Sequence, residues 1–86
     1  MKFEFDPAKS ELNRSKHGID FTAAQQLWED PGRLVIPART SDEPRYLLIG
    51  IWADKHWSAI FTLRKEAVRI ISVRRARSEE VELYEG

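Results

Sequence analysis

The spacing of hydrophobic residues changes near residue 32, from a helical repeat to strand-like alternation. The clearest helical repeat comprises Phe21, Ala24, Leu27 and Trp28. We expect this stripe to belong to the core rather than to a cofactor site. The pattern predicts strands at residues 1–5, 33–36, 45–52, 57–63 and 68–74, and helices at residues 7–17, 21–29 and 78–84.

Residues that favour helix ends flank each predicted helix. Asp6 can accept hydrogen bonds from the first free N–H groups of the first helix, and Pro7 suits its first position. Gly18 can adopt the left-handed conformation that ends it. Asp20 is the expected cap of the second helix and Ser78 that of the last.

Short turns join successive strands in the second half of the chain, which predicts an antiparallel meander. The strands at 45–52 and 57–63 are apolar on both faces, as expected at the centre of a sheet. The predicted order is β-α-α-β-β-β-β-α. This is an α+β fold with the helices packed on one face of a mostly antiparallel sheet.

The last strand combines apolar and basic residues. Alternation groups Ile70, Ser72 and Arg74 on one face against Arg69, Ile71 and Val73 on the other. We expect Ile71 and Val73 to meet the helices, which leaves the face with Ser72 and Arg74 open and polar.

Composition restricts the possible classes of function. The 86 residues, 10.0 kDa, correspond to one domain, residues 1–86. Cysteine is absent, which excludes a disulfide scaffold, a thiolate zinc site and a Cys nucleophile. The longest apolar run, 46–53, is too short to span a bilayer, and the N-terminus lacks the apolar core of a signal peptide. We therefore expect a cytoplasmic protein without a membrane partner.

Charge is balanced overall but unevenly distributed. The sequence has 14 basic and 14 acidic residues. Residues 64–77 nevertheless carry six basic side chains against one acidic one, and an acidic segment follows. This basic segment is either a local anion site or a solvated strand edge that pairs with the acidic helix.

Common catalytic motifs are missing. His17 and His56 lie in different predicted elements, and neither has carboxylates at metal-ligand spacing. The sequence contains no glycine-rich phosphate loop and no nucleophile elbow. We expect neither a metal nor another cofactor.

The remaining polar candidates suit metal-free cleavage of RNA. They are Lys16 and His17 at the end of the first helix, Arg45, Ser72 and Arg74. In this reaction the 2′-hydroxyl attacks the adjacent phosphate, a base and an acid transfer protons, and cations stabilise the phosphorane. Arginine binds phosphate through two nitrogens, and histidine exchanges protons near neutral pH.

Several of these residues also have a structural interpretation. His17 can interact with the helix dipole, and Arg74 can pair with the acidic last helix. Tyr84 can pack its ring with the hydroxyl at the surface. Trp52 and Trp57 flank a hairpin turn and can pack across the strands rather than stack on bases.

Two groups of residues carry a family resemblance. The first is Phe5-Asp6-Pro7-x-Lys9-x-x-x-Asn13-x-x-Lys16-His17-Gly18-Ile19-x-Phe21-x-x-Ala24. The second comprises Glu43-x-Arg45, Gly50, Arg69-Ile70-Ile71-Ser72-Val73-Arg74-x-Ala76 and Glu80-x-x-x-Tyr84. Together they resemble the BrnT toxins over nearly the whole chain. Two positions depart from the family: Phe5 replaces a frequent Trp, and Pro44 interrupts an acidic pair before Arg45.

The resemblance implies a toxin of a type II toxin–antitoxin system, with a RelE-like fold, that cuts RNA and arrests growth. It also implies a BrnA-like antitoxin that carries the DNA-binding domain, so operator DNA is met only through the antitoxin. The candidate catalytic residues are Lys16, His17, Arg45, Ser72 and Arg74. The candidate RNA-binding residues are Arg64, Arg69, Arg75, Arg77 and Tyr84. The alternative is a non-catalytic binding module, a degenerate toxin that binds only its antitoxin or nucleic acid.

Two expectations concern geometry. Lys16 and His17 should lie close to Ser72 and Arg74, because the polar end of the first helix does not suit a core. The antitoxin should dock on the basic segment 64–77 through an anionic segment of its own.

Overall fold

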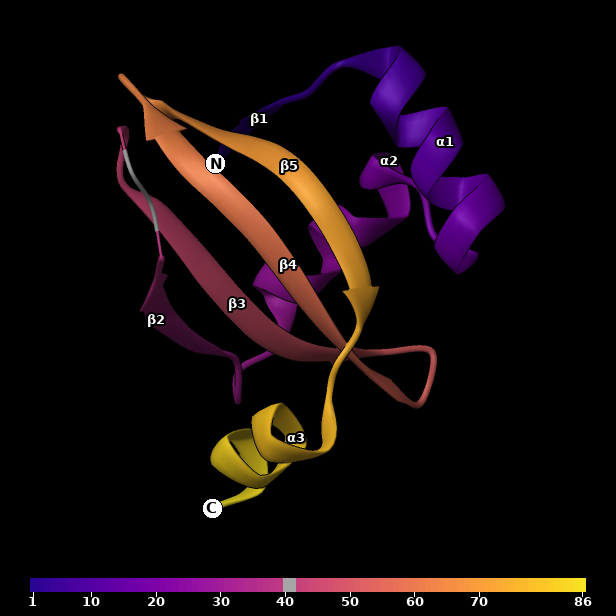
Figure 1. Ribbon diagram of the computed structural model, residues 1–86, viewed down its shortest axis with the longest axis vertical. Helices are drawn as coiled ribbons and strands as arrows, with labels where there is room; N and C mark the ends of the chain where they lie inside the picture. Colours follow the sequence, from indigo (N-terminus) through magenta and orange to yellow (C-terminus); the bar gives the residue numbers. More distant parts are fainter. Residues whose placement is uncertain (40–41) are drawn as a thin grey trace.

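Five strands form a single sheet in the computed structural model, which describes residues 1–39 and 42–86 (Figure 1). The strands lie in the order β1-β5-β4-β3-β2. Their bounds are Lys2–Glu4 (β1), Leu34–Ala38 (β2), Arg45–Trp52 (β3), Lys55–Arg64 (β4) and Ala67–Arg75 (β5). Strands β2 to β5 form the predicted antiparallel meander, whereas β1 pairs in parallel with β5. The predicted α+β class is confirmed.

Three α-helices and one 3₁₀ helix complete the fold. They are α1 (Pro7–His17), α2 (Phe21–Ala24), the 3₁₀ helix η1 (Gln25–Glu29) and α3 (Ser78–Glu85). Segment 21–29 is helical as predicted, with its second half in the tighter 3₁₀ form. The predicted caps Asp6 and Asp20 are confirmed, since each accepts a backbone N–H, at 2.9 and 2.8 Å. Gly18 ends α1 with a φ of 80°, the expected left-handed conformation.

The start of α3 differs from the sequence-based prediction. Ser78 is the first helical residue rather than the cap, and Arg77 occupies the cap position. The Glu80 side chain accepts a hydrogen bond from the Arg77 N–H at 2.8 Å. The carboxylate of Glu80 in the first turn therefore binds the cap residue, and the predicted Ser78 cap is wrong.

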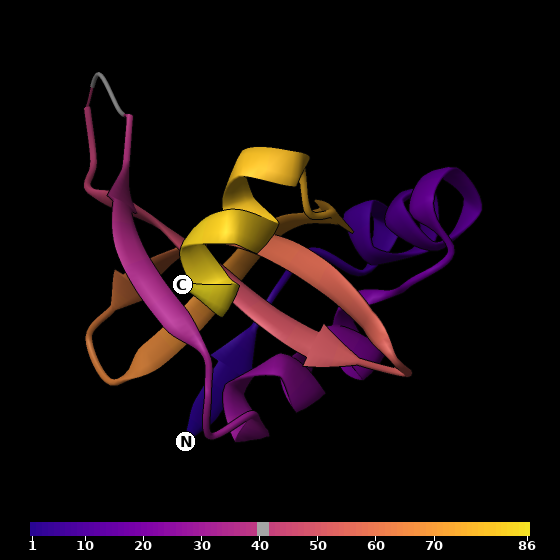
Figure 2. The same ribbon diagram turned by 90° about the horizontal axis from the view of Figure 1, so that it is seen from below.

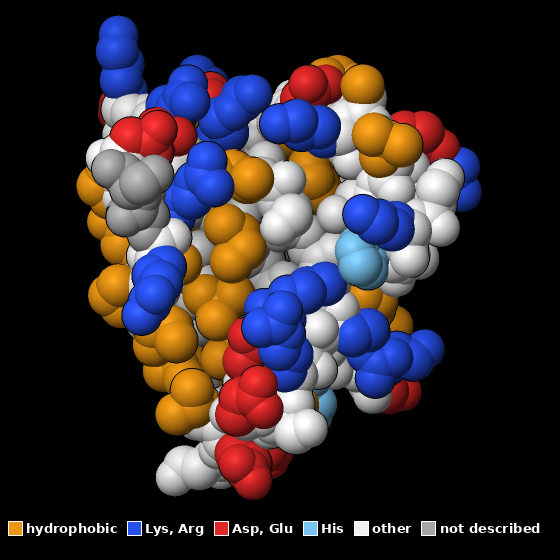
Figure 3. Space-filling model, viewed as in Figure 1, with side chains coloured by type: hydrophobic (Ala, Val, Ile, Leu, Met, Phe, Trp, Pro, Cys, Tyr) orange, Lys and Arg blue, Asp and Glu red, His pale blue; other side chains and the backbone are white. Residues whose placement is uncertain are grey.

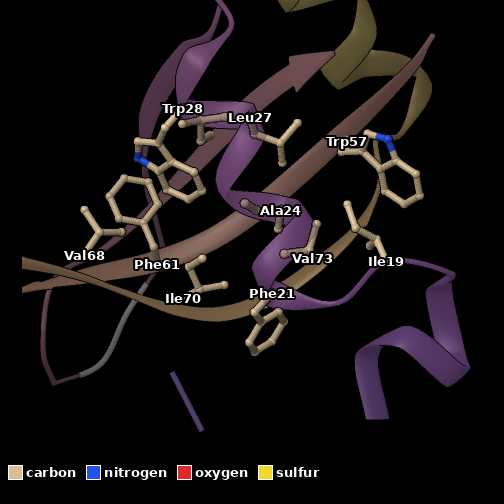
Figure 4. Packing of buried hydrophobic residues seen from close by; sticks show 12 residues of the cluster. Ile19, Phe21, Ala24, Leu27, Trp28, Trp57, Phe61, Val68, Ile70 and Val73 are labelled. Atoms are coloured by element: carbon tan, nitrogen blue, oxygen red, sulfur yellow. The ribbon is translucent and has the colours of Figure 1, made fainter. Parts of the chain in front are cut away.

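Helices α2 and η1 cover one face of the sheet, which we call the core face (Figure 4). The predicted stripe is buried there, and Ala24 and Leu27 are both 0% exposed. The strands contribute Leu48, Trp57, Ala59, Phe61, Val68, Ile70 and Val73. Trp28 packs edge-on against Phe61, with ring centroids 5.2 Å apart. The assignment of the stripe to the core is confirmed.

Helix α3 lies on the opposite face, which we call the α3 face (Figure 2). Ser58 alternates with Trp57 and Ala59 of the core cluster, so its side chain points away from the core. Its Oγ donates to Glu80 Oε1 of α3 at 2.8 Å. The prediction that the helices pack on one face is therefore wrong for α3. The buried residue of this helix is the polar Glu80, so it packs against polar groups instead of an apolar surface.

A β-bulge changes which face of the sheet the side chains of β5 point to. Ile60 pairs with Ser72, but the next residue of β4, Phe61, pairs with Ile70. Ile71 is therefore an extra residue, and Ile70 and Val73 both face the core. The predicted alternation is wrong on one side of the bulge, because Arg69 lies on the same face as Ser72 and Arg74 while Ile70 does not.

Candidate active site

Side chains from β3, β4 and β5 form three rows across the α3 face. The row farthest from α3 contains Arg45, Thr62 and Arg69, the middle row Leu47, Ile60 and Ser72, and the row beside α3 Ile49, Ser58 and Arg74. Adjacent strands are about 4.8 Å apart, so β3 and β5 are separated by about 10 Å. The side chain of Arg45 can cover part of that distance, so a phosphate bound between the two strands could meet both Arg45 and Ser72.

The Arg45 guanidinium forms no hydrogen bond or ion pair with any residue that the structure describes. Its Nε is buried and lacks a hydrogen-bond partner there. An unpaired buried donor costs about 1–3 kcal/mol. Because the rest of the guanidinium also has no partner among the described residues, its terminal nitrogens can bind an anion such as phosphate.

Arg74 already has an anionic partner. Its Nη1 and Nη2 donate to the two oxygens of Glu80, at 2.8 and 2.9 Å. This ion pair, together with the hydrogen bonds from the Arg77 N–H and Ser58 Oγ, lowers the pKa of Glu80 to about 2. The same pairing raises the pKa of Arg74. The structural interpretation of Arg74, a pair with the acidic last helix, is thus present in the molecule.

Asn13 joins α1 to β5 beside Ser72 and Arg74. Its Nδ2 donates to the Val73 carbonyl at 2.9 Å, and its Oδ1 accepts the Val73 N–H at 3.2 Å. Val73 lies between Ser72 and Arg74 in the strand. The side-chain amide of Asn13 therefore continues the pairing of β5 beyond the short strand β1. Sequence reasoning had assigned no role to Asn13.

Lys16 and His17 follow Asn13 by three and four residues in α1, so they share its side of the helix. Both are exposed at the C-terminal end of that helix. Because Asn13 faces Val73, this side of α1 is turned toward the C-terminal half of β5. Lys16 and His17 therefore lie on the side of α1 that faces β5, and their closeness to Ser72 and Arg74 stays a prediction.

The candidate RNA-binding residues divide between the two faces. Arg64 and Arg69 lie on the α3 face, with carboxylates at 3.7 and 3.3 Å. Arg75 lies on the core face, where its guanidinium is 5.6 Å from the centre of the Trp57 ring. Arg77 is exposed in the turn before α3. The structure therefore does not bring all four arginines to one surface.

Tyr84 makes contacts of a packed side chain. Its hydroxyl donates to Asp30 Oδ2 at 2.7 Å, which raises the pKa of Tyr84 to about 12. Its ring lies edge-on to His56, with centroids 5.2 Å apart. A phenol with this pKa is poorly suited to accept a proton from RNA.

Charged side chains surround an apolar centre on the α3 face (Figure 3). Lys and Arg side chains gather at the end of the sheet away from α3 and along the side near α1, whereas acidic side chains gather over α3. Among residues 1–39 and 42–86, no group of three or more His, Asp or Glu side chains could hold a metal ion. No helix in the part of the chain that the structure describes is long and apolar enough to cross a membrane.

Comparison with known proteins identifies the family. The family described as "Ribonuclease toxin, BrnT, of type II toxin-antitoxin system" matches residues 5–80, which include Lys16, His17, Arg45, Ser72 and Arg74. A search of curated proteins gave no match. Membership implies an RNA substrate and a cognate antitoxin protein. The chain therefore belongs to the BrnT family of ribonuclease toxins, the toxin component of BrnT/BrnA type II toxin–antitoxin systems.

Proposed function

We propose that this ribonuclease cleaves RNA on the α3 face without a metal ion. The observation that carries the proposal is the junction between Asn13 and Val73. It brings the side of α1 with Lys16 and His17 to the strand that carries Ser72. The proton-transfer groups of α1 and the hydroxyl of Ser72 would then meet beside β5, with Arg45 on β3 facing them across β4.

The proposed reaction uses the 2′-hydroxyl of RNA as the nucleophile. It attacks the adjacent phosphorus, the bond from phosphorus to the 5′-oxygen breaks, and a 2′,3′-cyclic phosphate forms. His17 and Lys16 are the proposed groups that move protons, one from the 2′-hydroxyl and one to the leaving 5′-oxygen. Ser72 is the proposed hydrogen-bond donor to the phosphate.

Arg45 and Arg74 have different proposed roles. Arg45 has no protein partner among the described residues and is the proposed ligand of the phosphorane oxygens. Arg74 is bound by Glu80 through both Nη atoms, so much of its charge is already neutralised. We assign it to the margin of the site, where Glu80 keeps its position fixed.

The proposed mechanism predicts how cleavage responds to three changes. Cleavage of a single-stranded RNA continues in EDTA, stops when the attacking 2′-hydroxyl is replaced by hydrogen, and yields a cyclic phosphate. Arg45→Ala and His17→Ala each lower the rate by about 100-fold or more. His56→Gln is the matched control, because the His56 side chain is bound by Glu85 of α3 at 2.7 Å and its ring packs against Tyr84, so it has no proposed role in cleavage.

Three experimental results would contradict the proposal. Loss of cleavage in EDTA with recovery on adding Mg²⁺ would establish a metal-dependent reaction. A purified chain that binds the antitoxin or RNA but does not cleave RNA would be the non-catalytic binding module. Unchanged cleavage by Arg45→Ala would remove Arg45 from the site.

The proposed partner is a BrnA-like antitoxin that links the toxin to operator DNA. Its proposed docking site is the basic part of the α3 face, where an anionic segment would cover Arg45 and Arg69 and exclude RNA. Because RNA is the substrate, we place the activity of the single domain, residues 1–86, in the cytoplasm. Competition between purified antitoxin and RNA tests the shared surface, and simultaneous binding of both would contradict it.

A further inference from the structure

A hollow of about 220 Å³ lies at the β4–β5 turn, at the end of the sheet away from α3. Its lining residues are Lys2, Glu4, Arg64, Lys65, Glu66 and Ala67. Ala67 pairs with Lys2 on one side and with Arg64 on the other, and the next residue, Val68, points into the core. The hollow therefore opens on the α3 face, the same face as the proposed site.

The charges in this hollow favour an anion. Three cations face two carboxylates; Arg64 is paired with Glu43 at 3.7 Å and Glu4 with Arg69 at 3.3 Å, which leaves Lys2 and Lys65 against Glu66. Lys2 and Lys65 are exposed and form no side-chain ion pair with any residue in the described part of the chain. Their ammonium groups are therefore available for a ligand.

We propose that this hollow binds a backbone phosphate of RNA at a distance from the phosphate that is cleaved. The inference rests on the proposed function. The row with Arg45 and Arg69 lies between the hollow and Ser72, so cations line the path from one to the other. Along β5 the distance from Arg74 to Ala67 is about 20 Å, which a single-stranded RNA of several nucleotides can span.

The hollow strengthens RNA binding and fixes the position of the RNA strand along the protein, but it does not recognise bases. Lysine is a flexible point charge that suits a phosphate oxygen and does not read the edge of a base. The hollow has no aromatic residue in its lining on which a base could stack. Its effect therefore depends on RNA length and on salt, and not on sequence.

The test compares a long RNA with a short one. The double variant Lys2→Gln/Lys65→Gln removes two charges with little change in side-chain length. Fluorescence anisotropy then measures the binding of a 2′-O-methyl dodecanucleotide and a 2′-O-methyl trinucleotide, neither of which can be cleaved. For the dodecanucleotide we expect Kd to rise about tenfold and the slope of log K against log salt to fall by about 0.7. For the trinucleotide we expect no change.

Two further variants test where the phosphate binds and whether the effect follows the sign of the charge that is removed. Glu66→Gln removes a carboxylate from the same hollow and should tighten binding of the dodecanucleotide. Lys55→Gln removes a lysine from the opposite end of β4, where Lys55 is the first residue of the strand, and should have no effect. Equal melting temperatures of all variants exclude a change in folding.

The outcomes separate this inference from the proposed function. If the unaltered protein cleaves RNA but the double variant keeps the same Kd and salt slope, the phosphate site is wrong and the proposed function stands. If only the binding of the antitoxin weakens, the hollow belongs to the protein interface and the inference is overturned. If the unaltered protein neither binds nor cleaves RNA, both fail.

Discussion

The two faces of the sheet are covered by helices in different ways. On the core face, α2 and η1 bury apolar side chains such as Phe21 and Leu27. On the α3 face, polar contacts join the helix to the rest of the fold, and its Leu83 is 57% exposed. These contacts include Glu80 with Arg74 and Ser58, Tyr84 with Asp30, and Glu85 with His56.

This difference matters for function. Apolar packing is non-directional, whereas each polar contact requires its partner at hydrogen-bond distance and angle. The core face therefore contributes stability, and the α3 face holds charged groups at defined positions. A site for an anionic substrate needs the second kind of surface.

The largest expected effect lies on the core face. Leu27→Ala should lower the free energy of unfolding by about 2–5 kcal/mol, because Leu27 is 0% exposed and its loss leaves a cavity. Urea unfolding measures the change. Leu12→Ala is the matched control, since Leu12 is 68% exposed, and it should change stability by less than about 0.5 kcal/mol. Similar effects of the two variants would contradict the assignment of the core.

Acid should weaken the α3 face selectively. The pKa of Glu80 is about 2 in the folded protein, against an ordinary value of 4.5 for a glutamate. A lowered pKa stabilises the fold above the unfolded pKa, so this contribution of about 3 kcal/mol is lost as pH falls from 4.5 toward 2. Unfolding at a series of pH values measures it. Glu80→Gln should be less stable at neutral pH and should lose less on acidification, and an unchanged pH profile would refute the role of Glu80.

Arg74→Ala should lower the free energy of unfolding by about 2 kcal/mol, because it leaves the largely buried carboxylate of Glu80 without its ion pair. The double variant Arg74→Ala/Glu80→Ala should be more stable than Arg74→Ala alone. Urea unfolding of the two single variants and the double variant measures this coupling. Strictly additive effects would show that the pair contributes nothing.

A smaller effect is expected where α1 meets the sheet. Asn13→Ala should cost about 1–2 kcal/mol, because it leaves the N–H and carbonyl of Val73 without their side-chain partner. It should also slow RNA cleavage, since α1 then loses the contact that places Lys16 and His17. Ser15→Ala, an exposed substitution in the same helix, is the control for both measurements. Normal cleavage by a destabilised Asn13→Ala would show that α1 does not position the reacting groups.

Local signals explain which parts of the fold were predictable. Helix caps such as Asp6 and Asp20, and the apolar stripe that includes Leu27, depend on neighbours in the sequence and were predicted correctly. The bulge at Ile71 depends on the register between β4 and β5, which the alternation within one strand does not contain. The face chosen by α3 depends on Glu80 finding Arg74 and Ser58.

The sequence supplied candidate residues for the site but not their contacts. Residue types alone led to Arg45 and His17 as candidates for RNA cleavage, and these roles stay predictions. The sequence left open whether Arg74 pairs with the last helix, and only the fold brings Glu80 to it. The sequence held one indication of the role of Asn13: it is a polar residue on a helix that has almost no apolar side chains for packing.

The smallest expected effect concerns the far end of α3. Tyr84→Phe keeps the aromatic ring against His56 but removes the hydroxyl that donates to Asp30 at 2.7 Å. Asp30 keeps its hydrogen bonds from the N–H groups of Ile51 and Gly32, so the loss should be only about 1 kcal/mol.

The direction of the pKa change gives the Tyr84 prediction a second readout. Burial alone would raise the pKa of Asp30, and the hydrogen bonds from Tyr84, Ile51 and Gly32 together lower it. Removing one donor should therefore raise the pKa of Asp30, which NMR titration of its carboxyl carbon measures. RNA cleavage should stay at the level of the unaltered protein if Tyr84 only anchors α3. A large loss of cleavage with little loss of stability would instead place Tyr84 in contact with RNA, and the α3 face would then extend its substrate surface onto the helix.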